Sequence, residues 1–247
     1  MRRILLEICV ETISDLDVAL QGGADRIELC GALALGGLTP SAGLARLAVE
    51  RAHADGKAIR AMVRPRDGDF AYDASALATA VAEGLALIDL GVDGLVFGAV
   101  RNGRLDLAIL RSWTQAMRDR RADIGLTLHR AIDLTDDPVA AVDQAVELGF
   151  DRILTSGGAV KAAEALPVLA AMRDRAAGRI VIMPGSGIRA ENARQTFEAT
   201  GATEVHASAS EEGDMSEARA LAMGFALGRA RRTSLAQVRA LREALDA

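Results

Sequence analysis

A short turn that recurs four times along the chain constrains its fold more than any other feature. In each copy an amphipathic segment ends at glycine, a polar residue follows, and a short aliphatic run begins. The four copies are Gly22-Gly23-Ala24-Asp25, Gly91-Val92-Asp93, Gly149-Phe150-Asp151 and Gly201-Ala202-Thr203. Glycine at this position stops a helix in a left-handed conformation. The repetition predicts a repeated helix-to-strand junction; ordinary helix stops in a two-domain α/β protein are the alternative.

Between these turns, short apolar runs alternate with longer amphipathic ones. We expect strands over 4–10, 25–30, 58–64, 94–98, 124–129, 152–155, 180–183 and 203–206. We expect helices over 14–21, 41–55, 74–90, 105–120, 137–148, 160–176, 189–200 and 234–246. Eight such units predict a parallel sheet closed into a single α/β domain over 1–247, a (β/α)8 or TIM barrel. The segment 207–233 is expected to be a long loop with some helix after the last strand, where a barrel can carry a lid.

Composition excludes several classes of protein. Half of the 247 residues are apolar but only 3% are aromatic, so aliphatic side chains must build the core. The net charge is −5 and there is no basic run, which argues against a nucleic-acid or anionic membrane surface. The first apolar run is interrupted by Glu7 and Glu11, and no apolar stretch reaches 18 residues, so we expect neither export nor a membrane span. Two cysteines make no disulfide framework, so we expect a cytoplasmic protein with free thiols.

Several predicted strands carry polar side chains on one face near their carboxyl ends. Residues two apart share a strand face. The pairs are Glu7 and Cys9, Glu28 and Cys30, Met62 and Arg64, Thr127 and His129, and Glu204 and His206. Ionisable groups are costly to bury in a barrel interior unless they are paired, and barrel enzymes place catalytic residues at this end. The pattern predicts a site there; an internal salt-bridge network of Glu7, Glu28, Glu204 and the arginines is an alternative that can coexist with it.

The histidines and cysteines offer two kinds of chemistry. His129 and His206 both end strands and could exchange protons or bind a metal, whereas His53 lies in a helix and is expected to be solvated. Cys9 and Cys30 end adjacent strands, which lie about 4.8 Å apart. Two thiolates at that spacing could hold Cu(I), although cysteine is also a small apolar filler. The residues alone leave both interpretations open.

Arginines and glycine–serine loops predict an anion site. Arg64 and Arg66 flank a proline and could present forked donors to an anion, with an Arg66–Asp69 ion pair as the alternative. The loops after the last three strands contain small residues, and loops after strands 7 and 8 commonly bind phosphate in this fold. The candidate phosphate-binding residues are Ser156, Gly157, Gly185, Ser186, Gly187 and Ser208, although tight turns use the same residues without a ligand.

The same segments, taken in order, resemble the CutC family. The matching segments are Leu6-Glu7-Ile8-Cys9, Arg26-Ile27-Glu28-Leu29-Cys30, Gly36-Gly37-Leu38-Thr39-Pro40-Ser41, Arg64-Pro65-Arg66 with Gly68-Asp69-Phe70, Leu128-His129-Arg130-Ala131-Ile132-Asp133, Leu154-Thr155-Ser156-Gly157-Gly158, Met183-Pro184-Gly185-Ser186-Gly187 and Glu204-Val205-His206. The resemblance implies a cytoplasmic TIM-barrel protein of copper homeostasis that forms homo-oligomers, either dimers or tetramers. By resemblance, Cys9 and Cys30 are the expected Cu(I) ligands.

A second hypothesis comes from the residues themselves. Two arginines, two strand-end histidines and three glycine–serine loops are more than a copper carrier needs. They fit an isomerase or lyase for a small phosphorylated or anionic metabolite, in which His129, His206 or Glu28 exchanges protons. Neither Lys57 nor Lys161 ends a predicted strand, so we expect no Schiff base. A non-catalytic sensor of such a ligand would need the same pocket.

Overall fold

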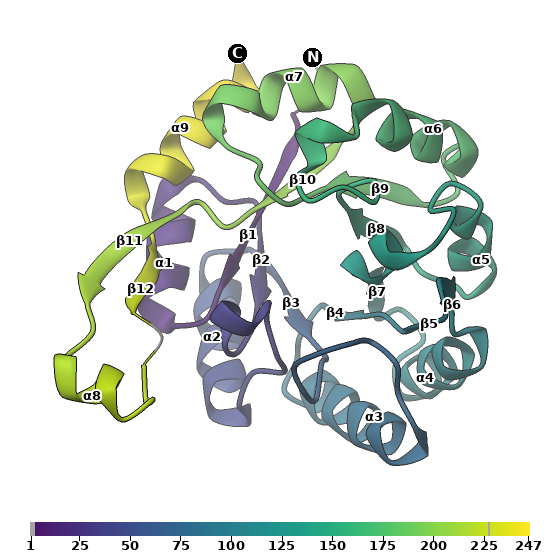
Figure 1. The fold of residues 1–247 in the computed structure, drawn as a ribbon, viewed down its shortest axis with the longest axis horizontal. Helices are drawn as coiled ribbons and strands as arrows, with labels where there is room; N and C mark the ends of the chain where they lie inside the picture. The colour runs from purple at the N-terminus through teal and green to yellow at the C-terminus, as the bar shows by residue number, and fades with distance from the viewer. Residues whose placement is uncertain (1–2, 227) are drawn as a thin grey trace.

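The computed structural model describes residues 3–226 and 228–247 and contains an eight-stranded parallel sheet rolled into a barrel (Figure 1). The strands follow the sheet order β10 (Glu204–Ala207), β1 (Leu5–Val10), β2 (Arg26–Leu29), β3 (Ala58–Met62), β4 (Gly94–Phe97), β7 (Gly125–Leu128), β8 (Arg152–Thr155) and β9 (Val181–Pro184). The end strands β9 and β10 lie side by side, so the sheet nearly closes on itself. The predicted TIM barrel is confirmed, with every barrel strand inside or within one residue of its expected range.

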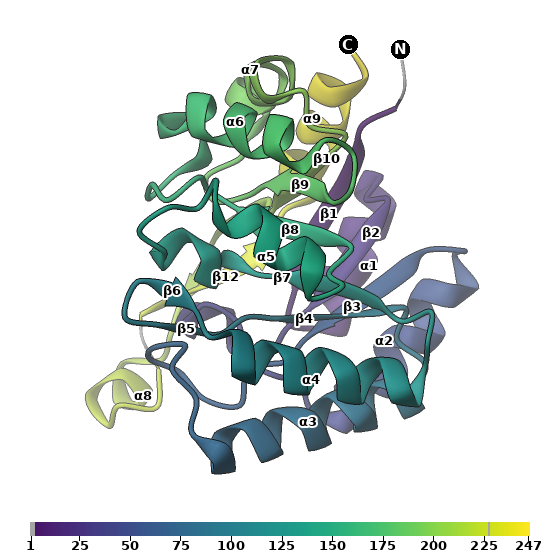
Figure 2. The ribbon, with the colours of Figure 1, turned by 90° about the vertical axis from the view of Figure 1, so that its right-hand side faces the viewer.

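Helices surround the barrel and cover its outer face (Figures 1 and 2). They are α1 (Ile13–Gly22), α2 (Ala42–Ala54), α3 (Ala74–Asp89), α4 (Leu107–Arg120), α5 (Ala141–Glu147), α6 (Leu166–Ala176), α7 (Ala190–Thr200) and α9 (Leu235–Asp246). Two helices, α5 and α6, begin more than three residues later than predicted. In α6 the start is fixed by Pro167 in the first turn, which has no N–H to offer a preceding turn. In front of it lies a short 3-10 helix, η3 (Ala162–Glu164).

The recurrent glycine turns do more than stop helices. Gly23, Gly91, Gly149 and Gly201 all have positive φ, between 65° and 99°, as predicted. In three of the four turns, the aspartate that follows accepts a hydrogen bond from a backbone N–H of the preceding strand. The bonds are Leu6 N to Asp25 at 3.0 Å, Ile59 N to Asp93 at 2.8 Å and Leu126 N to Asp151 at 2.6 Å. The aspartate thus ties each new strand to its neighbour and helps to set the register of the sheet.

The segment after the last barrel strand differs from the expected long loop. It forms an antiparallel ribbon of β11 (Ser210–Met215) and β12 (Arg229–Thr233), joined through α8 (Ala218–Ala222), with residue 227 outside the described part. Figure 1 shows this ribbon projecting from one side of the barrel. The ribbon strands carry mostly charged and polar residues, so no apolar alternation marks them in the sequence.

Strand register places the polar side chains in layers inside the barrel. Glu7 lies opposite both Arg26 and His206, and Cys9 lies opposite Glu28. The intervening residues on β1 and β2, such as Ile8 and Ile27, face outward and pack in the main apolar core with the helices. On these two strands the inward side chains are therefore mostly polar and the outward ones apolar. In the described part of the chain no helix is long and apolar enough to cross a membrane.

Candidate functional site at the carboxyl ends of the strands

An ion network of Glu7, Arg26, Arg152 and Glu204 lies in the deeper part of the barrel interior. Arg26 donates to both Glu7 and Glu204, and Arg152 Nε donates to Glu204 at 3.0 Å. Burial opposes ionisation, but Arg26 and Arg152 hold the pKa of Glu204 below its usual value. The pKa of Glu7 is likewise low, because Arg26 and His206 outweigh its burial. This is the salt-bridge network expected from the sequence for Glu7, Glu204 and the arginines, whereas Glu28, also expected in it, pairs with none of these arginines and faces His206 instead.

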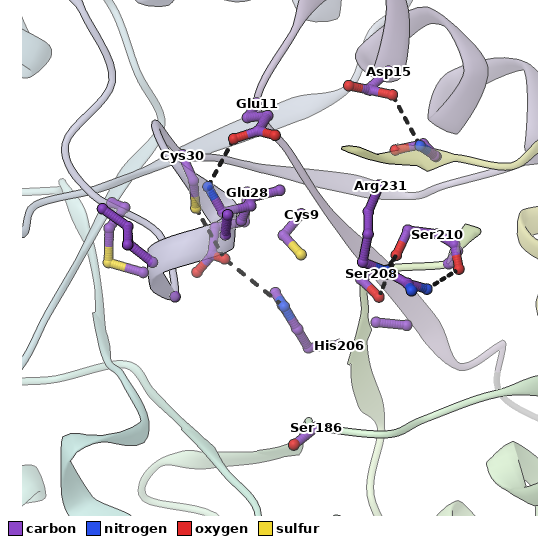
Figure 3. A pocket seen from close by; sticks show the side chains of 18 of the residues that line it. Cys9, Glu11, Asp15, Glu28, Cys30, Ser186, His206, Ser208, Ser210 and Arg231 are labelled. Atoms are coloured by element: carbon purple, nitrogen blue, oxygen red, sulfur yellow. Dashed lines mark hydrogen bonds and ion pairs between the residues drawn. The ribbon is translucent and has the colours of Figure 1, made fainter. Parts of the chain in front are cut away.

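Above this interior ion network lies a cavity of about 1160 Å³ at the carboxyl ends of the strands. Its lining includes many of the predicted site residues: Cys9, Glu28, Cys30, Arg64, His129, Ser186, Gly187, His206 and Ser208. Four predicted residues are not among those that line it: Arg66, Ser156, Gly157 and Gly185. Figure 3 shows part of this carboxyl-end cavity, with Cys9, Glu28, Cys30 and His206 close together.

Cys9, Glu28 and His206 form the group in the described chain whose donor atoms could hold a metal ion. One donor atom from each lies within 4.8 Å of the others, and all three residues are buried. His206 Nδ1 lies 2.9 Å from Glu7 Oε1 and its Nε2 lies 3.8 Å from Glu28 Oε2. Although burial opposes it, the pKa of His206 is raised well above 6.5 by Glu28, Cys9 and Glu7. The ring is thus oriented by one carboxylate with its other nitrogen facing the group.

Cys30 lies on the other side of Glu28. Its Sγ donates to Glu28 Oε2 at 3.6 Å, and Glu28 Oε1 has no hydrogen-bond partner among the described residues. Burial raises the pKa of Glu28 and raises that of the Cys30 thiol well above its usual value. Cys30 packs with Met62 and Val96. The two cysteines therefore flank one buried carboxyl group in the same cavity, and both are free thiols.

His129 presents a neutral ring on the β7 side of the cavity. Its Nδ1 accepts from Ala131 N at 3.1 Å, and this hydrogen bond assigns the ring proton to Nε2. Burial and then Arg64 lower the pKa of His129 to about 3. The buried Nε2 has no partner in the described structure. Gly98 leaves room for the ring, since a Cβ there would lie 2.5 Å from Nδ1.

The two arginines predicted to bind an anion have different surroundings. Arg64 is buried and donates to the carbonyls of Leu35 at 2.7 Å and Gly68 at 2.8 Å, while its Nε has no partner in the described chain. Arg66 is exposed and pairs with Asp69 at 2.7 Å. Arg66 thus makes the ion pair that the sequence left open as an alternative, outside the cavity lining.

The loop at Ser156 and Gly157 already surrounds a carboxylate of the chain itself. Asp133 accepts from Ser156 Oγ at 2.8 Å, from Ser156 N at 3.0 Å and from Gly158 N at 3.2 Å. Asp133 therefore occupies the position at which the sequence placed an external anion. The sequence analysis does not predict this role for Asp133, and the available signal is its place in the segment 128–133. Gly185 serves packing, since a Cβ there would lie 2.4 Å from Leu154.

The rim of the cavity holds residues that sequence reasoning missed. Arg231 and Arg232 of β12 line it, and Figure 3 shows Arg231 beside Ser208 and Ser210. Arg231 donates to Ser210 Oγ at 3.0 Å and to Ser210 O at 2.7 Å. No signal in the sequence pointed to these arginines, because they lie in the segment expected to be a loop.

Fold and site together define a TIM-barrel protein whose buried Cys–Glu–His group and neutral histidine share one cavity at the carboxyl ends of the strands. The CutC family profile matches residues 4–211. A protein of Sinorhizobium medicae named as a family protein CutC is 46% identical over 248 residues, covering 100% of this chain and 98% of its own length. The chain therefore belongs to the CutC family.

Other relatives support this assignment. The human copper homeostasis protein cutC homolog is 41% identical over 207 residues, covering 83% of this chain and 73% of its own length. The crystal structure of a CutC protein from Streptococcus agalactiae superimposes with a TM-score of 0.78 at 32% identity, covering 83% of this chain and 98% of its own. Thiamine phosphate pyrophosphorylase from Pyrococcus furiosus, at 14% identity and a TM-score of 0.60 over 98% of this chain and 96% of its own, shares the fold alone.

Proposed function

We propose that this protein binds Cu(I) at the cavity and acts in copper homeostasis. The observation that carries the proposal is the arrangement of Cys9, Glu28 and His206, whose donor atoms lie within 4.8 Å of one another. Thiolate sulfur and imidazole nitrogen are ligands that copper favours, and thiolates in particular select Cu(I). The names of the human relative and of the Streptococcus agalactiae protein are consistent with such a role.

The surroundings of His206 support a metal ligand. Metal-binding histidines usually donate their second ring nitrogen to a carboxylate, which fixes the ring and makes it a better ligand. Here Nδ1 faces Glu7 at 2.9 Å, and Glu7 is itself held by Arg26. The proposed ligands are Cys9 and His206, with Cys30 as the second thiolate expected from the family resemblance. Binding must release the thiol protons and the ring proton that His206 holds because of its raised pKa, so we expect affinity to fall as the pH is lowered.

The proposal includes a cytoplasmic location and a homo-oligomer. Both cysteines are free and buried, and thiols that must remain available to Cu(I) persist in a reducing compartment. The cavity opens at the end of the barrel, which offers an entry and exit path to the ion. Light scattering coupled to gel filtration tests the dimer or tetramer that the family resemblance predicts.

Anaerobic Cu(I) titration against a competing chelator tests the metal site. We expect Cys9→Ser, Cys30→Ser and His206→Gln each to weaken binding by at least tenfold. His53→Gln is the matched control, because His53 is exposed and pairs with Asp93 outside the cavity. Wild-type affinity in both cysteine variants and in His206→Gln would overturn the proposal.

A further inference from the structure

Two buried N–H donors in the carboxyl-end cavity have no acceptor in the described chain. They are Arg64 Nε and His129 Nε2, and the two residues are only 6% and 3% exposed. Both lie against Phe70: the His129 ring is 4.8 Å from the Phe70 ring, and the Arg64 guanidinium is 4.9 Å from it. One aromatic side chain therefore gathers both donors on the β3–β7 side of the cavity, and all three residues line it.

Leaving these donors unpaired is costly. A buried polar group without a hydrogen bond loses its hydration without compensation. The two terminal nitrogens of Arg64 each have an acceptor already, since Nη1 donates to the carbonyl of Leu35 and Nη2 to that of Gly68. The nearby carboxylate of Asp133 is saturated by Ser156, Gly158 and other donors of its loop. The missing acceptor must therefore come from outside the described chain.

The chemistry of the donors specifies that acceptor. Arg64 supplies a positive charge and His129 a neutral N–H, and Phe70 provides a flat apolar wall beside them. A planar carboxylate matches this set, with its charge on the guanidinium side and its carbon atoms against the ring. We propose that Arg64, His129 and Phe70 form a binding site for a small organic carboxylate, separate from the proposed copper ligands.

The protonation state of His129 is consistent with this role. The charged groups that face it are Arg64, Arg130 and Asp133, and burial is the main cause of its low pKa of about 3. The ring therefore keeps a single N–H from pH 6 to pH 8. We expect no change in carboxylate affinity from this histidine across that range.

This site deepens the second hypothesis from the sequence, a protein acting on a small anionic metabolite. Of the predicted anion site, this part is supported by the unpaired donors of Arg64 and His129. Phosphate binding at Ser186, Gly187 and Ser208 stays a prediction. It does not depend on copper, because Cys9 and His206 contribute none of its donors. Failure of the copper proposal and failure of this one are therefore separable.

Isothermal titration and thermal shift with pyruvate, malonate and inorganic phosphate test the inference. We expect a carboxylate to bind and to raise the melting temperature, because a ligand that binds the native state stabilises it. His129→Asn should weaken that binding by about tenfold or more, since it removes a hydrogen bond to a charged group. Asn retains an acceptor for the Ala131 N–H, and His53→Asn is the matched control.

Two further variants keep the outcome decisive. Phe70→Leu removes the aromatic wall and should also weaken carboxylate binding if His129→Asn proves unstable. Cys9→Ser should leave carboxylate binding unchanged while it weakens Cu(I) binding. Binding of phosphate alone, no carboxylate binding at millimolar concentration, or equal binding by wild type, His129→Asn and Phe70→Leu would overturn the inference.

Discussion

The interior ion network and the carboxyl-end cavity lie on the same inward faces of the same strands, one above the other. In the network the carboxylates of Glu7 and Glu204 are paired with Arg26 and Arg152, and their pKa values are low. Two residues further along β2, Glu28 has a raised pKa and an oxygen without a partner in the described chain. Two neighbouring inward residues of β2 therefore differ: Arg26 is paired with two carboxylates, whereas one oxygen of Glu28 has no partner in the described chain.

The two regions differ in how completely their buried polar atoms are paired. A buried charge is tolerated when it is paired and hydrogen-bonded, and it costs free energy when its partner is removed. Glu7 belongs to both regions, because it pairs with Arg26 below and orients His206 above. The network therefore holds the cavity residues in place, and the unpaired atoms of the cavity are those available to a ligand.

The largest effect should come from breaking the network. Arg26→Met leaves Glu7 and Glu204 with buried charges that have lost a partner, so we expect a loss of about 3–5 kcal/mol in the free energy of unfolding. Urea unfolding measures it. Arg46→Met is the control, because Arg46 and Glu50 form an exposed pair whose loss should cost under about 0.5 kcal/mol. Equal losses in the two variants would contradict the distinction.

Replacing Glu28 by an uncharged residue should raise the free energy of unfolding rather than lower it. Its folded pKa is raised, so the folded state binds more protons than the unfolded chain above about pH 4.5, and stability falls as the pH rises. At pH 8 we expect Glu28→Gln to be more stable than wild type by about 0.5–2 kcal/mol, as is common when a functional group is removed. Glu204→Gln, whose carboxylate is paired, should be destabilised. Calorimetry that found Glu28→Gln less stable would show that the contacts of Glu28 with His206 and Cys30 outweigh the cost of burying its charge.

His129 should make the free energy of unfolding depend on pH in the acid range. Its folded pKa is about 3 against 6.5 in the unfolded chain, so between these values the unfolded state binds the extra proton and stability falls as the pH falls. From pH 6 to pH 5 this amounts to about 1 kcal/mol. His129→Asn should lose that part of the slope in urea unfolding, and His53→Asn should retain it. Identical slopes in wild type and His129→Asn would contradict the neutral ring.

The smallest effect is expected at Arg66. This exposed side chain pairs with Asp69 outside the cavity lining, so Arg66→Ala should change stability by no more than about 0.5 kcal/mol. Pyruvate or malonate affinity should also remain at the wild-type value. A tenfold loss of carboxylate binding would return Arg66 to the anion site that the sequence suggested.

Much of the fold and part of the site could be predicted because local signals were consistent. The glycine turns, the apolar periodicity and strand parity placed Cys9, Glu28, Cys30, His129 and His206 near one end of a barrel. The same reasoning did not show whether the loop at Ser156 is open to an external anion. In the structure the carboxylate of Asp133 already accepts its hydrogen bonds. It also gave no sign that β12 brings Arg231 to the rim, since charged ribbon strands carry no apolar pattern.

The sequence by itself determined the barrel, its strand faces and which side chains point inward, because helix stops and a period of two are local properties of the chain. Only the tertiary structure decided which inward charges are paired and which atoms face the cavity without a partner. Pairing depends on distances between strands far apart in sequence, such as that between His206 and Glu7. Such distances, and the burial that gives them their energy, exist only once the sheet has closed.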